Sequence, residues 1–152
     1  DFHTEFKIKS GVSTVQYEAE HGTKKFWEFV NDQGLSFWSE MTPMQDMEEL
    51  KSFVFDNFLR IGILSSSSRK NGSVHADAGK RLWLQKYNFS SQISDNDIII
   101  VDSAKDKQIY AKPGRILVDD YEKNINSWRA KGGIGIKHVH ANKTIKELYK
   151  YV

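Results

Sequence analysis

The chain contains no cysteine, which excludes a disulfide framework and a thiolate metal site. An intracellular, cytoplasmic setting is the default for such a protein. The sequence also lacks any apolar run of membrane-spanning length and any signal-peptide pattern at its N-terminus. An excess of one charge is missing as well, because 22 basic and 20 acidic residues leave a formal net charge of +2. This balance argues against nucleic acid or an anionic membrane as the partner.

The composition is that of an ordinary globular domain, with 39% hydrophobic and 28% charged residues in 152 positions. No repeat or low-complexity linker divides it. Residues 1–58 are mainly helical in pattern and rich in aromatics, whereas strand and helix patterns alternate over residues 59–152. That alternation predicts an α/β fold with a Rossmann-like parallel sheet and helices on both faces.

Individual elements follow from periodicity and boundary residues. Helical patterns cover residues 3–35, 46–58, 74–87, 121–131 and 142–152, and strand patterns cover residues 61–64, 98–101, 116–118 and 134–136. Asp46 with Glu49 resembles a capping box for the second helical segment. Asn142 is expected to cap the last one.

The stretch Arg115-Ile-Leu-Val-Asp119-Asp120 places two adjacent carboxylates directly after a short apolar run. Such a run is typical of a parallel strand covered on both faces, and ligands of open α/β sheets bind beyond the carboxyl ends of these strands. Two neighbouring acids favour a hard cation such as Mg²⁺. The alternative is that Asp119 or Asp120 simply caps the following helix, and the pair alone does not decide between the two interpretations.

Three predicted strands end in polar residues: Ser65 follows residues 61–64, the Lys105–Lys107 segment follows residues 98–101, and the acidic pair follows residues 116–118. Parallel strands would bring all three groups to one edge. A hydroxyl, an ammonium and carboxylates at one edge suit a phosphate group and its metal ion. We therefore expect at least one carboxylate within hydrogen-bond reach of Ser65 or Lys107.

These residues also carry a resemblance to a known family. Ile-Leu-Ser65, Ala104-Lys-Asp-Lys107 and Ile-Leu-Val-Asp119-Asp120 resemble motifs of the haloacid dehalogenase superfamily of phosphatases. The chain is most similar to the 5′(3′)-deoxyribonucleotidase-like branch, which includes nucleotidase-like proteins of bacteriophages. The segment after Asp120, with Asn124, Trp128 and Gly132-Gly133, is similar to the sequence that follows the acidic pair in that branch. The resemblance extends over nearly the whole chain.

The resemblance implies a magnesium-dependent phosphatase that hydrolyses (deoxy)nucleoside monophosphates through a phosphoaspartate. In this scheme Ser65 grips the phosphate, Lys107 stabilises its charge, and Asp119 and Asp120 hold Mg²⁺. Residues 1–58 would be mostly a cap over the site. The remaining expected substrate contacts are Ser66 and Arg69, with Phe2 and Trp38 stacking on a base. The expected partner is a phosphorylated small molecule such as a nucleotide, and a homodimer is left open.

One element of the family pattern is missing. The superfamily uses an Asp-x-Asp motif at the end of its first strand, and no such motif lies near this N-terminus. Asp95-Asn96-Asp97 has the spacing but precedes a predicted strand, so it does not qualify. Asp1-Phe2 resembles the residues just downstream of the motif. We therefore expect a fragment that lacks the first strand and its nucleophile and is inactive alone. The alternative is a natural, non-catalytic binding or regulatory module.

Other interpretations are weaker. A receiver-type signalling domain also combines acids, a hydroxyl and a lysine, but its acidic pair comes near the start of the chain. His138 and His140 would share one face of an extended segment and could bind a transition metal, although no third ligand is near in sequence. A nucleic-acid interface would use Arg69-Lys70 and Lys105–Lys107, but the basic residues are too dispersed.

Overall fold

The computed structural model describes all residues from Asp1 to Val152. The elements in chain order are α1 (Phe2–Ser10), α2 (Thr14–Asp32), α3 (Ser36–Ser39), α4 (Met47–Asn57), β1 (Ile63–Ser66), η1 (Arg69–Asn71), α5 (Ala76–Lys86), η2 (Asp95–Asp97), β2 (Ile98–Val101), η3 (Ala104–Tyr110), β3 (Ile116–Asp119), α6 (Glu122–Ala130), β4 (Ile134–Lys137), α7 (Ala141–Leu148) and η4 (Tyr149–Tyr151). None of the helices combines the length and the apolar character that crossing a membrane requires.

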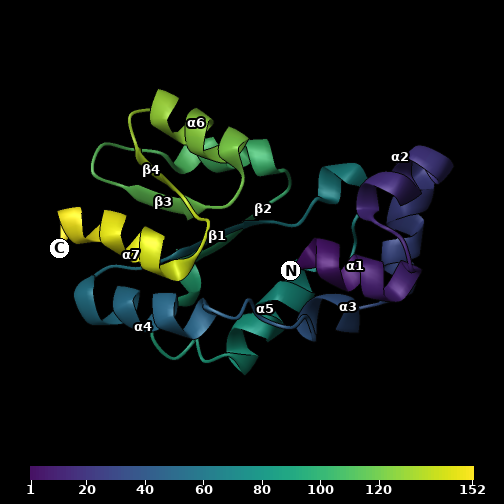
Figure 1. The fold of residues 1–152 in the computed structure, drawn as a ribbon, viewed down its shortest axis with the longest axis horizontal. Coiled ribbons are helices and arrows are strands. Elements are labelled where there is room, and N and C mark those ends of the chain that lie inside the picture. The colour runs from purple at the N-terminus through teal and green to yellow at the C-terminus, as the bar shows by residue number, and fades with distance from the viewer.

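The molecule is elongated, and its two ends differ in architecture (Figure 1). Helices α1, α2 and α3 form one end. The four strands form the other end, together with α4, α6 and α7, and α5 lies between the two. Although α4 belongs to the first 58 residues, it packs against α7, where the rings of Phe53 and Tyr149 have centroids 4.8 Å apart.

The strands form two small parallel sheets. β1 pairs with β2 in the register Ile63 to Ile98, and β3 pairs with β4 in the register Ile116 to Ile134. The chain is therefore an α/β protein with parallel strands, as the alternating pattern predicts. The difference from the expected single sheet is that no strand hydrogen bonds join β1 to β3.

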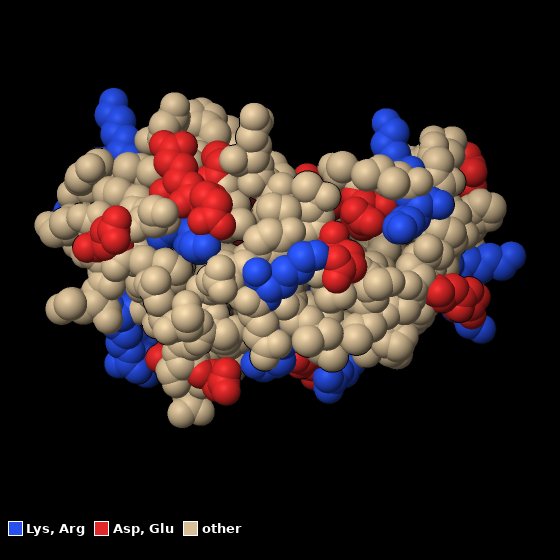
Figure 2. Space-filling model, turned by 90° about the horizontal axis from the view of Figure 1, so that it is seen from below, with Lys and Arg blue, Asp and Glu red and all other residues tan.

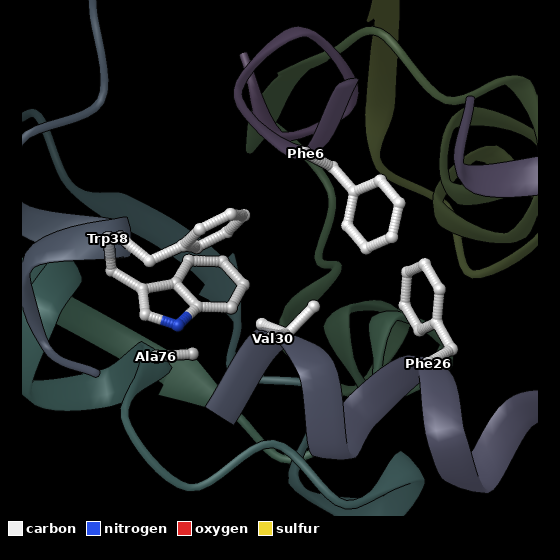
Figure 3. Packing of buried hydrophobic residues seen from close by; sticks show 6 residues of the cluster. Phe6, Phe26, Val30, Trp38 and Ala76 are labelled. Carbon is white, nitrogen blue, oxygen red and sulfur yellow. The ribbon is translucent and has the colours of Figure 1, made fainter. Parts of the chain in front are cut away.

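The aromatic residues of the helical end form its core (Figure 3). Phe6 and Val30 are fully buried, and Trp38 is 4% exposed. Gly79 of α5 lies against this core, because a Cβ at its position would overlap the Cβ of Trp38. A glycine inside a helix costs about 1 kcal/mol relative to alanine, and here it permits close approach of α5 to α3. The contact fixes the next residue, Lys80, beside Trp38.

Two smaller clusters support the sheets. One contains Leu84, Ile93 and Ile98 beneath β1 and β2, and the other contains Leu117, Ile125 and Trp128 between β3 and α6. In the second cluster the indole N–H of Trp128 donates to the carbonyl oxygen of Arg115 over 3.2 Å, which satisfies a polar group that burial would otherwise leave unpaired.

Neither predicted capping bond forms, although Asp46 does occupy the N-cap position of α4. The side chain of Asp46 makes no capping bond to α4, since its backbone (φ −100°, ψ 9°) is not in the extended conformation typical of an N-cap. Its Oδ2 instead accepts a hydrogen bond from the backbone N–H of Ala141 at the start of α7, over 2.5 Å. Asn142 lies within α7, which begins one residue earlier. Asp46 therefore caps a helix that lies 95 residues downstream of it.

Candidate phosphate-binding site

The carboxyl end of β1 holds a hydroxyl and an ammonium in contact. The Nζ of Lys80, from α5, lies 3.0 Å from the Oγ of Ser65. The same Nζ donates to the carbonyl oxygen of Ser66 over 2.5 Å. A helix that follows β1 thus returns a lysine to the end of that strand.

Lys80 is a partly buried cation that forms no ion pair. Its Nζ lies 5.3 Å from the centroid of the Trp38 ring, a cation–π distance, and its other contacts are neutral oxygens. The pKa of Lys80 is lowered from 10.5 to about 8, chiefly by burial and also by the nearby charge of Lys107, whereas the charge of Asp77 acts in the other direction. A cation held without a neutralising carboxylate attracts an anion.

A second lysine lies at the carboxyl end of β3. The Nζ of Lys107, from η3, is 2.6 Å from the Oδ2 of Asp119. The side-chain amide of Asn124 lies 3.1 Å from both carboxylate oxygens, and the backbone N–H of Tyr121 donates to Oδ1 over 2.8 Å. The expected contact between the acidic pair and Lys107 is therefore present. Asp119 also accepts a hydrogen bond from the backbone just before α6. It therefore partly caps the following helix, which is the alternative role that the sequence left open.

The carboxylates do not form a ready-made magnesium site. Both oxygens of Asp119 already accept hydrogen bonds, and Asp120 is exposed. No group of three or more histidine, aspartate or glutamate side chains is placed to hold a metal ion. Mg²⁺ takes close to six oxygen ligands and usually engages one or two carboxylates together with substrate phosphate. The donor set present is therefore incomplete for Mg²⁺.

The two histidines considered as metal ligands lie at the start of α7. His138 Nδ1 is 2.9 Å from the hydroxyl of Thr144, and its Nε2 is 3.9 Å from Asp46. His140 is exposed at the position that precedes α7. No third ligand joins them.

Two adjoining cavities lie beside the lysines. The larger, of about 890 Å³, is lined by Ser65, Lys80 and Trp38 together with residues of both sheets. The smaller, of about 450 Å³, is lined by Lys107 and the acidic pair. Their shared walls are formed by Asp1, Met44, Leu50, Leu64, Val118 and His138. The predicted groups therefore converge on one region of the molecule, but face two connected spaces.

Most of the other residues expected to contact the substrate do not line the larger cavity. Trp38 is buried, and its ring stacks on Phe2 with centroids 5.3 Å apart. The Oγ of Ser66 accepts from the backbone N–H of Ser68 over 3.2 Å. Arg69 is exposed and lies 3.6 Å from a carboxylate oxygen of Asp102. Of this set, Trp38 alone lines the larger cavity with Ser65.

Lys80 and Asn124 are the site residues that the sequence analysis missed. Lys80 sits on a helical pattern where a lone lysine is ordinarily solvated. The one available signal was Gly79 before it, since a glycine within a helix often marks a close approach. Asn124 belongs to the segment that resembles the family, and its bond to Asp119 depends on where α6 begins.

The surrounding surface carries mixed charge. On the face drawn in Figure 2, basic and acidic side chains are interspersed, and no extended area has one sign. This distribution does not favour a nucleic-acid interface.

A scan against models of protein families finds no match for the chain, and searches of curated proteins and of solved structures also find none. Any functional assignment therefore depends on the residues of the site.

Proposed function

We propose that this chain forms the phosphate-binding part of a magnesium-dependent phosphatase of the haloacid dehalogenase type, acting on (deoxy)nucleoside monophosphates. Its nucleophilic aspartate would lie upstream of Asp1. The observation that carries this proposal is the pairing of Lys80 with Ser65 over 3.0 Å, close to a second lysine, Lys107, whose charge lowers the pKa of the first. Two ammonium groups and a hydroxyl at strand ends form an anion site rather than a solvated surface.

Each group has a defined role in this proposal. The Ser65 hydroxyl donates a hydrogen bond to a phosphate oxygen, and Lys80 neutralises part of the phosphate charge. Lys107 contacts Asp119 and lines the smaller cavity, where it can stabilise negative charge as the phosphoryl group is transferred. None of these side chains is a carboxylate free to attack phosphorus, so the nucleophile must come from elsewhere.

In this proposal Asp119 and Asp120 would hold the magnesium ion. The ion would shield phosphate charge when bound, and Asp120 is the carboxylate with free oxygens. Asp1 also lines this cavity, and its carboxylate accepts a hydrogen bond from the backbone N–H of Thr4. The remaining ligands would have to come from the substrate and from the segment that carries the nucleophile.

The fold assignment is part of the same proposal. The two sheets would belong to one Rossmann-like sheet, with the helical residues 1–58 acting mostly as a cap, in a cytoplasmic enzyme. The nucleoside part of the substrate would stack on the aromatic pair of Phe2 and Trp38, whose rings are stacked on each other and of which Trp38 lines the larger cavity. Stacking of a base on an aromatic ring contributes about 1–3 kcal/mol, which would favour nucleotides over sugar phosphates.

A non-catalytic anion-binding module is the second candidate. The specific observation in its favour is that Asp119, the only buried carboxylate near the lysines, is held by Lys107 and Asn124. In this alternative the chain binds a phosphorylated ligand and releases it unchanged.

Calorimetric titration with inorganic phosphate, thymidine monophosphate and thymidine tests the binding site. We expect phosphate and the nucleotide to bind and the nucleoside to bind much more weakly. Lys80→Met should weaken phosphate binding by about tenfold or more, since a charged hydrogen bond contributes about 1.5–3 kcal/mol. Lys9→Met, which removes an exposed lysine of α1, is the matched control and should change nothing. Equal affinity of the two variants would refute the site.

A second measurement separates the two candidates. A chain extended upstream by a segment ending in Asp-x-Asp-Gly should release phosphate from deoxynucleoside monophosphates when Mg²⁺ is present. Replacing the first of those aspartates by asparagine should abolish release. Phosphate binding without turnover in the extended chain would support the binding module instead.

A further inference from the structure

Lys80 is a partly buried amine whose close polar contacts are all neutral. Its Nζ donates to the hydroxyl oxygen of Ser65 over 3.0 Å and to the carbonyl oxygen of Ser66 over 2.5 Å. The nearest charged-group partner is replaced by an aromatic one, the ring of Trp38, whose centroid lies 5.3 Å from Nζ. Buried lysines are ordinarily paired with a carboxylate, so these contacts set Lys80 apart.

These contacts suit the uncharged form of the amine. A neutral lysine amine has two N–H groups, and the oxygens of Ser65 and Ser66 accept two hydrogen bonds from Nζ. An ammonium has a third N–H, which finds only the face of the Trp38 ring. The site therefore satisfies both N–H groups of the neutral amine and leaves its lone pair free.

The surroundings of Lys80 also favour loss of its proton. Its pKa is lowered from 10.5 to about 8, chiefly by burial and also by the charge of Lys107 from η3, whereas the charge of Asp77 on its own helix acts in the other direction. At about pH 8 roughly half of the Lys80 side chains are therefore neutral, but an ordinary lysine is less than about 1% neutral. Desolvation and a neighbouring cation are the conditions that make a lysine nucleophilic toward carbonyl compounds.

The amine lines a space that is large enough for a small organic molecule. Lys80 and Ser65 both belong to the wall of the larger cavity, which has a volume of about 890 Å³ and is lined mainly by hydrophobic residues. Close packing of Gly79 against Trp38 fixes α5 beside this wall. Apolar walls exclude water, and they therefore protect a water-sensitive adduct formed on the amine.

We propose that the Nζ of Lys80 is a nucleophile that condenses with small aldehydes in the larger cavity to form a Schiff base. The nitrogen lone pair forms a bond to the carbonyl carbon, and the π pair of the C=O bond moves to oxygen. Both amine protons leave with that oxygen as water, and a carbon–nitrogen double bond remains. The Ser65 hydroxyl, 3.0 Å from Nζ, is placed to relay these protons.

The kind of aldehyde is a separate question from the nucleophile. A preference for aldehydes that carry a phosphate group rests on the proposed function, because it requires the anion site. The reactivity of the amine itself rests only on the contacts and the cavity of Lys80.

Lys107 provides an internal comparison. It is also partly buried and lines the adjoining cavity, but its Nζ lies 2.6 Å from a carboxylate oxygen of Asp119. An ammonium engaged in an ion pair has no lone pair to offer. We therefore expect Lys107 to stay unmodified where Lys80 reacts. Lys9, an exposed lysine of α1, represents the lysines that are accessible but not desolvated.

Reductive trapping followed by peptide mapping tests the nucleophile. The full chain is incubated at about pH 8 with propanal or with pyridoxal 5′-phosphate, and cyanoborohydride converts each imine to a stable amine. At low conversion we expect Lys80 to be modified at least about tenfold more than Lys9 or Lys107, a margin that allows for its partial burial. The rate at Lys80 should level off once the pH exceeds its pKa, while the rate at Lys9 continues to rise. Lys80→Arg keeps the charge without a reactive amine and should abolish the preferred modification.

The outcomes separate this inference from the proposed function. Modification that follows exposure alone, with Lys80 marked no more than Lys9, would overturn the nucleophile even if the chain binds phosphate. Equal preference of propanal and pyridoxal 5′-phosphate for Lys80, unaffected by added inorganic phosphate, would support the nucleophile and contradict the anion site. Protection of Lys80 but not of Lys9 by inorganic phosphate would support both.

Discussion

The ammonium of Lys107 lies 2.6 Å from Oδ2 of Asp119, and both side chains are largely withdrawn from water, with exposed fractions of 13% and 5%. Such a pair differs from the exposed ion pairs elsewhere on the molecule, because each charge depends on the other for solvation. Removing one partner leaves an uncompensated charge in a partly apolar setting. The pair thus links the end of β3 to η3 as well as lying at the candidate site.

Lys107→Met should lower the free energy of unfolding by about 3–5 kcal/mol, because it leaves the Asp119 carboxylate without its counter-ion. The double variant Lys107→Met with Asp119→Asn should recover much of this loss, since it removes both charges. Urea denaturation measures the effect.

The matched control is Lys150→Met. Lys150 also pairs with an acid, Glu147, over 2.6 Å, but 58% of its side chain is exposed. Its loss should have little effect on stability, because water screens an exposed ion pair. Equal losses for Lys107 and Lys150 would show that the Lys107 pair is not effectively buried.

Gly79→Ala should destabilise the fold, although alanine is the better helix former. A Cβ at this position overlaps the Cβ of Trp38 and approaches the carbonyl oxygen of Leu35 to 3.1 Å. Overpacking of this kind costs about 1–3 kcal/mol. The opposite change on the exposed neighbour, Ala78→Gly, should cost about 1 kcal/mol through helix propensity alone. A thermal scan in which Gly79→Ala raises the midpoint would contradict the close packing of α3 and α5.

The sequence predicted the strands well because their signal is local. The uninterrupted apolar runs at residues 98–101 and 116–118 form β2 and β3 with bounds that agree closely. Their parallel pairing also follows from the alternation of strands with helices. What the pattern could not show is that β1 and β3 do not pair, since pairing between them depends on segments distant in sequence.

The same difference between local and distant contacts explains why only part of the site could be predicted. Lys107 and Asp119 are only 12 residues apart across a single turn between elements, and their contact was expected. Lys80 reaches Ser65 through the packing of Gly79 against Trp38, a tertiary contact that no local motif encodes. The predicted capping bond of Asp46 to α4 is absent for the same reason, because its carboxylate instead accepts from Ala141, which is distant in sequence.

Asp46→Ala should destabilise the protein through α7 rather than α4. The carboxylate accepts from the N–H of Ala141, so its loss leaves the first turn of α7 without that acceptor, at a cost of about 1–2 kcal/mol. Hydrogen exchange should therefore accelerate first in α7. Asp95→Ala, which alters an exposed acid outside the sheets, serves as the control. Faster exchange confined to α4 would restore the capping-box prediction.

Anion affinity should fall as pH rises above about 8, because Lys80 then loses its proton. Burial lowers the pKa of this lysine from 10.5 to about 8. Below that value the ammonium is charged in both folded and unfolded chains, so the site keeps its charge. Between about 8 and 10.5 only the unfolded chain retains the proton, so folding stability rises with pH while anion binding weakens.

Sulfate is a suitable probe for this last effect, since its own charge is constant across the range. Its association constant should decrease by at most about tenfold per pH unit above the pKa of Lys80, the limit set by loss of one proton. Lys80→Arg should retain binding and flatten the profile, because the guanidinium stays charged. Lys80→Met should bind weakly at every pH. A Lys80→Met variant that kept both the affinity and the slope would place the titrating cation elsewhere and remove the main support for the phosphate site.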